Sequence, residues 1–184
     1  TLRSIGVQAF QGTSLTSAHL PESVETVANE TFLNCKSLAN VTLGKALTSI
    51  GSDVFSGCSS LTTAYLNTPV VGMKRFADVV FGDAKSSVVE VTIGSSVSSI
   101  GDYAFSGCSK LVNVTIHEGV REIGVWAFAG VSNLVSIVIP DSMTDIGHYA
   151  FAVTGLRKVH LGASLTRINH YVFEQCKDLV NVTI

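Results

Sequence analysis

The sequence contains little charge and has no long apolar run. Only 14% of its 184 residues are charged, and the formal net charge is −2. Such a chain lacks the positive field that binding to nucleic acid or to an anionic membrane requires, so neither is expected as a partner. No apolar run approaches the roughly 18 residues that a membrane-spanning helix needs, so direct membrane insertion is not expected either.

Signals of secretion are also missing, because no signal peptide precedes the first residues. The chain begins with TLRSIG and ends with NVTI, and both strings are parts of a phrase that recurs elsewhere. We therefore expect a fragment of a longer chain, for which a missing signal says little about localisation.

Motifs of catalysis and metal binding are absent as well. The sequence has no nucleophile motif, no phosphate-binding loop and no H-E-x-x-H pair. No C-x-x-C pair occurs, and a single row of cysteines does not place four ligands tetrahedrally. His148 and His170 fall in the same position of successive repeats and should be neighbours, but no carboxylate shares that position nearby. We expect no catalytic residues, no cofactor and no metal site.

The four cysteines favour free thiols over disulfides. Each lies three residues after a phenylalanine, at a position that holds Ala, Val or Thr in other repeats. A position that accepts these residues suits a small, buried side chain, and a free cysteine behaves as a small hydrophobe. The residues are Cys35, Cys58, Cys108 and Cys176.

One repeated phrase dominates the sequence. It reads IGSDVFSGCSSLTTAYL at 50–66, IGDYAFSGCSKLVNVTI at 100–116 and INHYVFEQCKDLVNVTI at 168–184. The apolar residue that opens its L-x-x-V-x-L part recurs at steps of 23, 23, 27, 23, 23, 22 and 23 residues. A period this constant predicts a solenoid. The opening residues are Leu15, Leu38, Leu61, Val88, Leu111, Leu134, Leu156 and Leu179.

Each repeat predicts a short strand, a turn and one helical turn that ends in phenylalanine. Apolar and polar residues alternate in segments such as 112–116, which is typical of a strand with one buried face. A single repeat does not cover its own apolar residues, but stacked repeats form a continuous core. We therefore expect eight parallel strands on one side and buried rows of Leu/Val, Ile and Phe.

The phrase LVNVTI…GVREIGVWAFAGVSNL resembles the BspA-like class of leucine-rich repeats. The resemblance covers the whole chain, in eight strand phrases and seven I-G-x-x-A-F phrases. It implies a single leucine-rich repeat solenoid domain over 1–184, a right-handed superhelix. The parallel sheet would be concave, with short helical or 3-10 turns on the convex side. It also implies a cell-surface or secreted protein of bacteria or parasitic protists that adheres to host cells or matrix.

The repeat near 67–88 is irregular, because its step is four residues longer than the others. Val80 and Phe81 are expected to fill the regular A-F position, so the extra residues fall around 73–78. They add two adjacent positive charges, Lys74 and Arg75. The segment is either a tolerated loop bulge or a recognition loop beside the binding face, and the sequence leaves both interpretations open.

Two rows of side chains are candidate binding surfaces. The outward strand residues form a polar, nearly uncharged concave face suited to a broad protein surface, unless they are simply exposed strand residues that bind nothing. With the irregular loop, the predicted protein-binding residues are Tyr65, Lys74, Arg75, Glu90, Asn113 and Thr115. The rival row consists of the aromatic residues just before A-F in successive repeats. These residues either form a binding surface or pack along the convex turn and shield its backbone: Tyr103, Trp126, Tyr149 and Tyr171.

These observations favour a non-enzymatic, surface-displayed module that binds a host or matrix protein. Two other interpretations stay open. The chain could be a spacer or stalk with no ligand of its own, or an intracellular scaffold.

Overall fold

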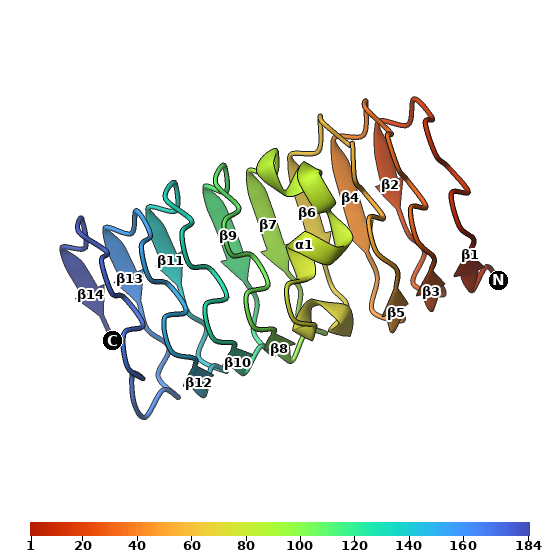
Figure 1. Ribbon diagram of the computed structural model, residues 1–184. Helices are drawn as coiled ribbons and strands as arrows, with labels where there is room; N and C mark the ends of the chain where they lie inside the picture. Colours follow the sequence, from red (N-terminus) through yellow and green to blue (C-terminus); the bar gives the residue numbers. More distant parts are fainter.

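The computed structural model describes residues 1–184 as a parallel-strand solenoid of about eight rungs, one for each repeat. Eight strands form a main row along one side, and every pairing within it is parallel (Figure 1). The predicted eight-stranded solenoid is confirmed. The strands are β2 (Ser17–His19), β4 (Asn40–Leu43), β6 (Thr63–Leu66), β7 (Glu90–Ile93), β9 (Asn113–Ile116), β11 (Ser136–Val138), β13 (Lys158–His160) and β14 (Asn181–Thr183).

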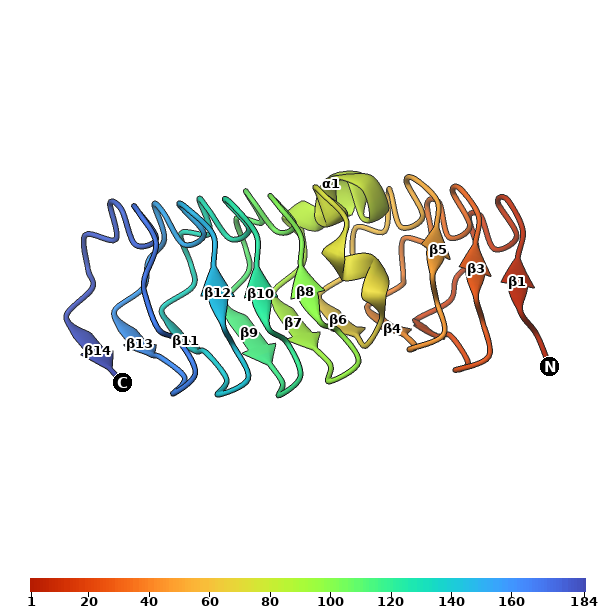
Figure 2. The ribbon, with the colours of Figure 1, turned by 90° about the horizontal axis from the view of Figure 1, so that it is seen from below.

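A second row of two-residue strands lies between the main strands and the helical turns of most rungs, but none follows β13. It forms two separate three-stranded parallel sheets, β1-β3-β5 and β8-β10-β12. Figure 2 shows these strands crossing the rungs between the main sheet and the helical turns on the opposite side. The strands are β1 (Ser4–Ile5), β3 (Thr26–Val27), β5 (Ser49–Ile50), β8 (Ser99–Ile100), β10 (Glu122–Ile123) and β12 (Asp145–Ile146).

A ladder of phenylalanine rings runs through the core. Neighbouring rings in regular rungs stack nearly parallel, as in Phe105–Phe128 and Phe128–Phe151, with centroids 5.3 Å apart in both pairs. All nine phenylalanines of the chain belong to the ladder, and Phe10 at its first position is 38% exposed. The predicted buried Phe row is confirmed for every rung except the first and the last, where Phe173 is half-buried.

Close stacking of the rungs requires glycine after the second-row strand. A Cβ atom at Gly124 would lie 2.5 Å from the backbone nitrogen of Asp102 on the preceding rung, a separation that real Cβ atoms do not show. The I-G pair of the repeat is therefore a packing requirement: the isoleucine fills the core, and the glycine lets two backbones approach.

The irregular repeat is accommodated by three short helices in place of a second-row strand. They are η1 (Pro69–Gly72), α1 (Phe76–Val80) and η2 (Gly82–Ser86). The buried Thr68 hydroxyl caps η1 and donates a 2.6 Å hydrogen bond to the Leu47 carbonyl. As a result the second row is interrupted between β5 and β8, whereas the main sheet continues without a break from β6 to β7.

The insertion also contributes two rings to the ladder instead of one. Phe81 packs 6.0 Å from Phe55 on the preceding rung, and Phe76 packs 5.8 Å from Phe105 on the following rung. The two rings meet edge to face at 5.5 Å. The prediction that Val80 and Phe81 fill the regular A-F position is therefore right in part. Phe81 makes the ring contact with the preceding rung, but Phe76 makes the contact with the following rung.

The cysteines are all free, and three of them are buried. Burial raises the pKa of the Cys58 and Cys108 thiols to about 12. The Cys58 thiol donates a hydrogen bond to the Phe32 carbonyl of the preceding rung, with 3.2 Å between sulfur and oxygen. Cys176 is only half-buried, because the last rung has no neighbour on its outer side.

Removing one ring from the middle of the ladder should unfold the protein more easily than removing one from its start. Phe128→Ala should lower the free energy of unfolding by about 3–5 kcal/mol, since a fully buried aromatic leaves a cavity. Phe10→Ala should cost markedly less. Denaturant unfolding of both variants measures the difference, and a loss below about 1 kcal/mol for Phe128→Ala would contradict the burial of the ladder.

Thiol titration should separate the cysteines by burial. At mildly alkaline pH, Cys58 and Cys108 should stay unreactive in the native protein, because their raised pKa keeps them protonated and the core excludes the reagent. Cys176 should react first. All four should react after unfolding, and four rapidly reacting thiols in the native state would refute the assignment.

Candidate functional site

The outward side chains of the main sheet, on the face that we expect to be concave and call the concave row, bring together four of the predicted binding residues. Thr63 and Glu90 are register partners on β6 and β7, and Glu90 is in turn the partner of Asn113 on β9. Tyr65 is 40% exposed on β6, two residues beyond Thr63. Thr115 lies in the same outward orientation on β9, and the four side chains share one face of the sheet.

The main row is divided into two sheets at this point, which the repeat pattern did not predict. Strands β2, β4, β6, β7 and β9 form one sheet, and β11, β13 and β14 form the other. No backbone hydrogen bond joins β9 to β11. We call this interruption the seam.

Proline removes one hydrogen bond from the seam. On the central rungs the residue that follows the main strand donates its N–H to the preceding rung, as His117 does to the Ile93 carbonyl at 3.0 Å, whereas Gly44 and Gly162 do not. Pro140 occupies that position after β11 and has no N–H to give to Ile116. Its place in the repeat was the only sequence signal for the seam.

A cavity of about 370 Å³ opens at the seam on the concave face. Glu90, Asn113 and Thr115 line it on one side, and Ser136 and Val138 line it on the other. Three of the predicted binding residues therefore surround a real depression, at the one place where the main sheet is interrupted.

The loop cations Lys74 and Arg75 do not join this surface. The insertion lies on the side opposite the main sheet, where α1 is drawn in Figure 2. Arg75 lies over the Tyr103 ring, with its Cζ 4.9 Å from the ring centroid, and Lys74 Nζ is 5.7 Å from the same centroid. The expectation that the loop lies beside the concave face is therefore wrong, because the extra residues enter the helical turn rather than the strand.

Arg75 is further held by Asp78, with 3.3 Å between its Nη1 and Oδ2 atoms. Lys85 forms a second ion pair with the same carboxylate. Partial burial opposes ionisation of Asp78, but the hydrogen bonds and charges of Lys85 and Arg75 outweigh it and lower the pKa of the carboxyl. Lys74 is thus the one cation of the insertion with no acidic partner.

The four aromatic residues form a stacked stripe on the helical-turn side. Ring centroids lie 6.4, 4.4 and 4.7 Å apart along the row, with interplanar angles of 7°, 8° and 10°. Because the rings stack on one another and Arg75 covers Tyr103, the flat faces of Tyr103, Trp126 and Tyr149 are occupied, and only Tyr171 at the end of the row is 56% exposed. Stacking of sugar rings needs an open face, so this geometry favours the interpretation that the stripe shields the turn.

The backbone under the stripe is in the left-handed region. Trp126 and Tyr149 have φ values of 59° and 58°, and the non-glycine residues at the equivalent positions of other rungs are also positive. This conformation costs an L-residue roughly 1–2 kcal/mol. Gln8, Glu30 and Asp53 take the same conformation without aromatic side chains, so the geometry of the rung imposes it rather than the stack.

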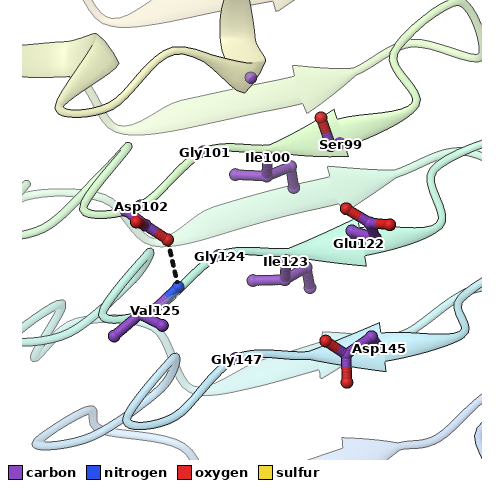
Figure 3. A pocket seen from close by; sticks show the side chains of 11 residues that line it. Ser99, Ile100, Gly101, Asp102, Glu122, Ile123, Gly124, Val125, Asp145 and Gly147 are labelled. Carbon is purple, nitrogen blue, oxygen red and sulfur yellow. Dashed lines mark hydrogen bonds between the residues drawn. The ribbon is translucent and has the colours of Figure 1, made fainter.

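A second cavity, of about 340 Å³, follows the second row of strands. Glu122 and Asp145 are register partners there, and their carboxylates point the same way in Figure 3. Asp102 accepts a 2.8 Å hydrogen bond from the Val125 N–H, so its carboxylate is used within the fold. The signal for this groove was the acidic residue before I-G in two successive repeats.

The predicted histidine neighbours are confirmed, since the His148 and His170 rings lie 5.1 Å apart. No cluster of three or more His, Cys, Asp or Glu side chains is arranged to hold a metal ion. None of the helices has the length and apolar composition needed to cross a membrane.

The family model for the BspA type Leucine rich repeat region matches residues 1–81 and 74–184, which together span the chain. The resemblance found in the sequence is thereby confirmed. No curated protein matches the chain.

Several crystal structures have a similar fold. A T. pallidum leucine-rich repeat protein is 24% identical, with a TM-score of 0.54, over 91% of this chain and 69% of that one. A leucine-rich repeat protein from Bacteroides ovatus is 21% identical, with a TM-score of 0.51, over 98% of this chain and 58% of that one. A leucine rich cell surface protein from Faecalibacterium prausnitzii is 22% identical, with a TM-score of 0.52, over 99% and 69%. These likenesses establish the fold.

Replacement by glycine and by alanine should affect the free energy of unfolding in opposite order at Tyr149 in the stripe and at Val138 on a strand. At Tyr149, where φ is 58°, Gly should give a more stable protein than Ala by about 1 kcal/mol, because only Gly adopts this conformation without strain. At Val138, on the extended strand β11, Ala should instead be better than Gly by about 0.5–1 kcal/mol. Denaturant unfolding of the four variants tests this, and the same ranking at both sites would contradict it.

Proposed function

The chain belongs to the BspA-type leucine-rich repeat family, and from this premise we propose that it is a non-enzymatic module that binds a protein through its concave face. Leucine-rich repeat domains are generally binding or scaffold modules, which supports a role in recognition. The observation that carries the choice of surface is the cavity at the seam, lined by Glu90, Asn113 and Thr115.

The chemistry of the concave face suits a protein partner. Its outward side chains are short and polar, with few charges, so they offer many hydrogen bonds to a broad surface. Tyr65, 40% exposed, adds an aromatic side chain of the kind that is enriched at interface hot spots. The opposite face of the main strands from β2 to β13 packs against the core and is not free to bind.

We propose a host or matrix protein as the partner, and display at the cell surface or secretion as the setting. One protein of similar fold is described as a leucine rich cell surface protein, which is compatible with this setting. The competing roles are a spacer without a ligand and an intracellular scaffold. Binding by the isolated chain distinguishes the proposed role from the spacer.

The aromatic stripe is the second candidate surface. The stripe begins beside two cations, Lys74 and Arg75, and ends at the exposed ring of Tyr171. Its ring faces are already stacked, however, which leaves it less surface for recognition than the concave row offers.

Binding to purified collagen, fibronectin and laminin, each immobilised, tests the proposal. The double variant Tyr65→Ala/Glu90→Ala should weaken binding roughly tenfold or more, as loss of interface anchors does. Its free energy of unfolding should change by less than about 1 kcal/mol, because both residues are exposed. Trp126→Ala should bind like the unaltered chain.

Two outcomes would contradict the proposal. If Trp126→Ala abolishes binding while the double variant does not, the stripe is the working surface. If none of these proteins, nor intact host cells, retains the chain, the spacer role is favoured instead.

A further inference from the structure

We propose that the seam between β9 and β11 binds an extended peptide segment of the partner, with one apolar residue between a basic and an acidic residue. This inference rests on the proposed function and assigns the chemistry of the segment that the concave face recognises. It follows from unpaired backbone groups, exposed apolar side chains and two unpaired charges.

The backbone of β9 directs unpaired groups into the seam. The N–H groups of Asn113 and His117 donate to the preceding rung, to the Val89 and Ile93 carbonyls at 3.1 and 3.0 Å. Backbone groups alternate in direction along a strand, so those of Val114 and Ile116 face β11. No backbone partner meets them there.

Strand β11 presents the complementary groups. Ile139 donates its N–H to the His160 carbonyl on β13, and the Val135 carbonyl accepts from the following rung. By the same alternation, Ser136 and Val138 face β9 and find no backbone partner across the seam. A parallel sheet interrupted in this way offers both donors and acceptors to a peptide backbone.

Burial shows that the seam is open to solvent. Val91 is fully buried on β7, whereas Val114, its register partner on β9, is only half-buried. Both residues occupy the same inward position of the repeat. The difference places an accessible depression at β9, and the cavity of about 370 Å³ fills it.

Apolar side chains surround this depression. Its apolar lining is Val114, Ile116, Ile137 and Val138, and Val138 on β11 is 62% exposed. Such a group in the middle of a polar face indicates contact with an apolar residue of the occupant.

Unpaired charges lie on either side of the seam. The outward row reads Glu90, Asn113, Ser136 and Lys158 on successive rungs. Neither Glu90 nor Lys158 forms a salt bridge within the chain, although both are exposed. Arg157 adds a further cation beside Lys158. A basic side chain of the occupant would meet Glu90, and an acidic one would meet Lys158.

The spacing of these charges sets the length of the segment. Three strand-to-strand steps separate Glu90 from Lys158. Two are paired at about 4.8 Å and the third crosses the unpaired seam, so the two strands lie on the order of 15 Å apart. An extended peptide advances about 3.3 Å per residue, so residues four apart match this span. Strands β9 and β11 still contact each other, so a whole strand does not fit between them, and the segment lies across the seam.

The test is a titration of the isotopically labelled chain with a capped nonapeptide, Gly-Ser-Arg-Ser-Leu-Ser-Glu-Ser-Gly, followed by amide chemical shifts. Saturable shifts should centre on the amides of Val114, Ser136 and Val138. Glu90→Gln and Lys158→Gln should each weaken binding roughly two- to fivefold, the usual effect of one exposed ion pair.

Matched controls define the specificity. Glu122→Gln, on the second row of strands, and Lys36→Gln, far along the solenoid, remove the same charges elsewhere and should leave the affinity unchanged. A peptide with Gln in place of both Arg and Glu, and one with Ser in place of Leu, should bind more weakly than the parent. The amide spectrum of each variant verifies that it is folded.

The inference is overturned if the nonapeptide gives no saturable shifts up to millimolar concentration, or if the uncharged peptide binds equally well. It is also overturned if the shifts centre on the second row of strands. If the peptide fails while Tyr65→Ala/Glu90→Ala still weakens binding to a matrix protein, only the seam assignment is lost. If that double variant leaves matrix binding unchanged, the proposed function itself fails.

Discussion

The stacking of one rung directly on the next, in register, is the constraint from which the other features follow. Backbone groups of each rung hydrogen-bond to the same positions of its neighbour, so every side chain lies beside its counterpart one repeat away. Phenylalanine therefore meets phenylalanine, and Tyr149 meets Trp126 and Tyr171. The same closeness demands glycine at Gly124 and tolerates a left-handed backbone at Trp126, because neighbouring rungs hold both in place.

The register explains why much of the fold could be predicted from the sequence. A constant period fixes which residues share a row, so burial of Phe128 and the alternation of β9 followed from counting alone. The seam could not be predicted in this way, because it depends on how two neighbouring backbones pair and not on which residues share a row, and Pro140 removes only one donor there. The side on which Lys74 and Arg75 lie depended on which part of the repeat was lengthened. The sequence did not show this, because two residues, Phe76 and Phe81, share the one ladder position of that repeat.

The two interruptions of the solenoid complement each other. The insertion breaks the second row between β5 and β8, where the main sheet is continuous. The seam breaks the main row between β9 and β11, where the second row continues through β10 and β12. Each break is thus bridged by the other row and by the phenylalanine ladder. A single core of buried residues extends from Ile5 to Val172 across both.

The interruption of the main sheet at the seam also affects how specifically this face can bind a partner. A regular solenoid repeats the same short polar side chains on every rung, so a ligand gains little by choosing one rung over the next. Asn40 and Asn113 occupy equivalent positions, but only Asn113 lies beside a seam. Unpaired backbone groups, the exposed Val138 and the unpaired Glu90 occur together at this one place. Specific binding on a repetitive face requires such a local departure, and the seam provides it on the concave side, where side chains are not committed to the core.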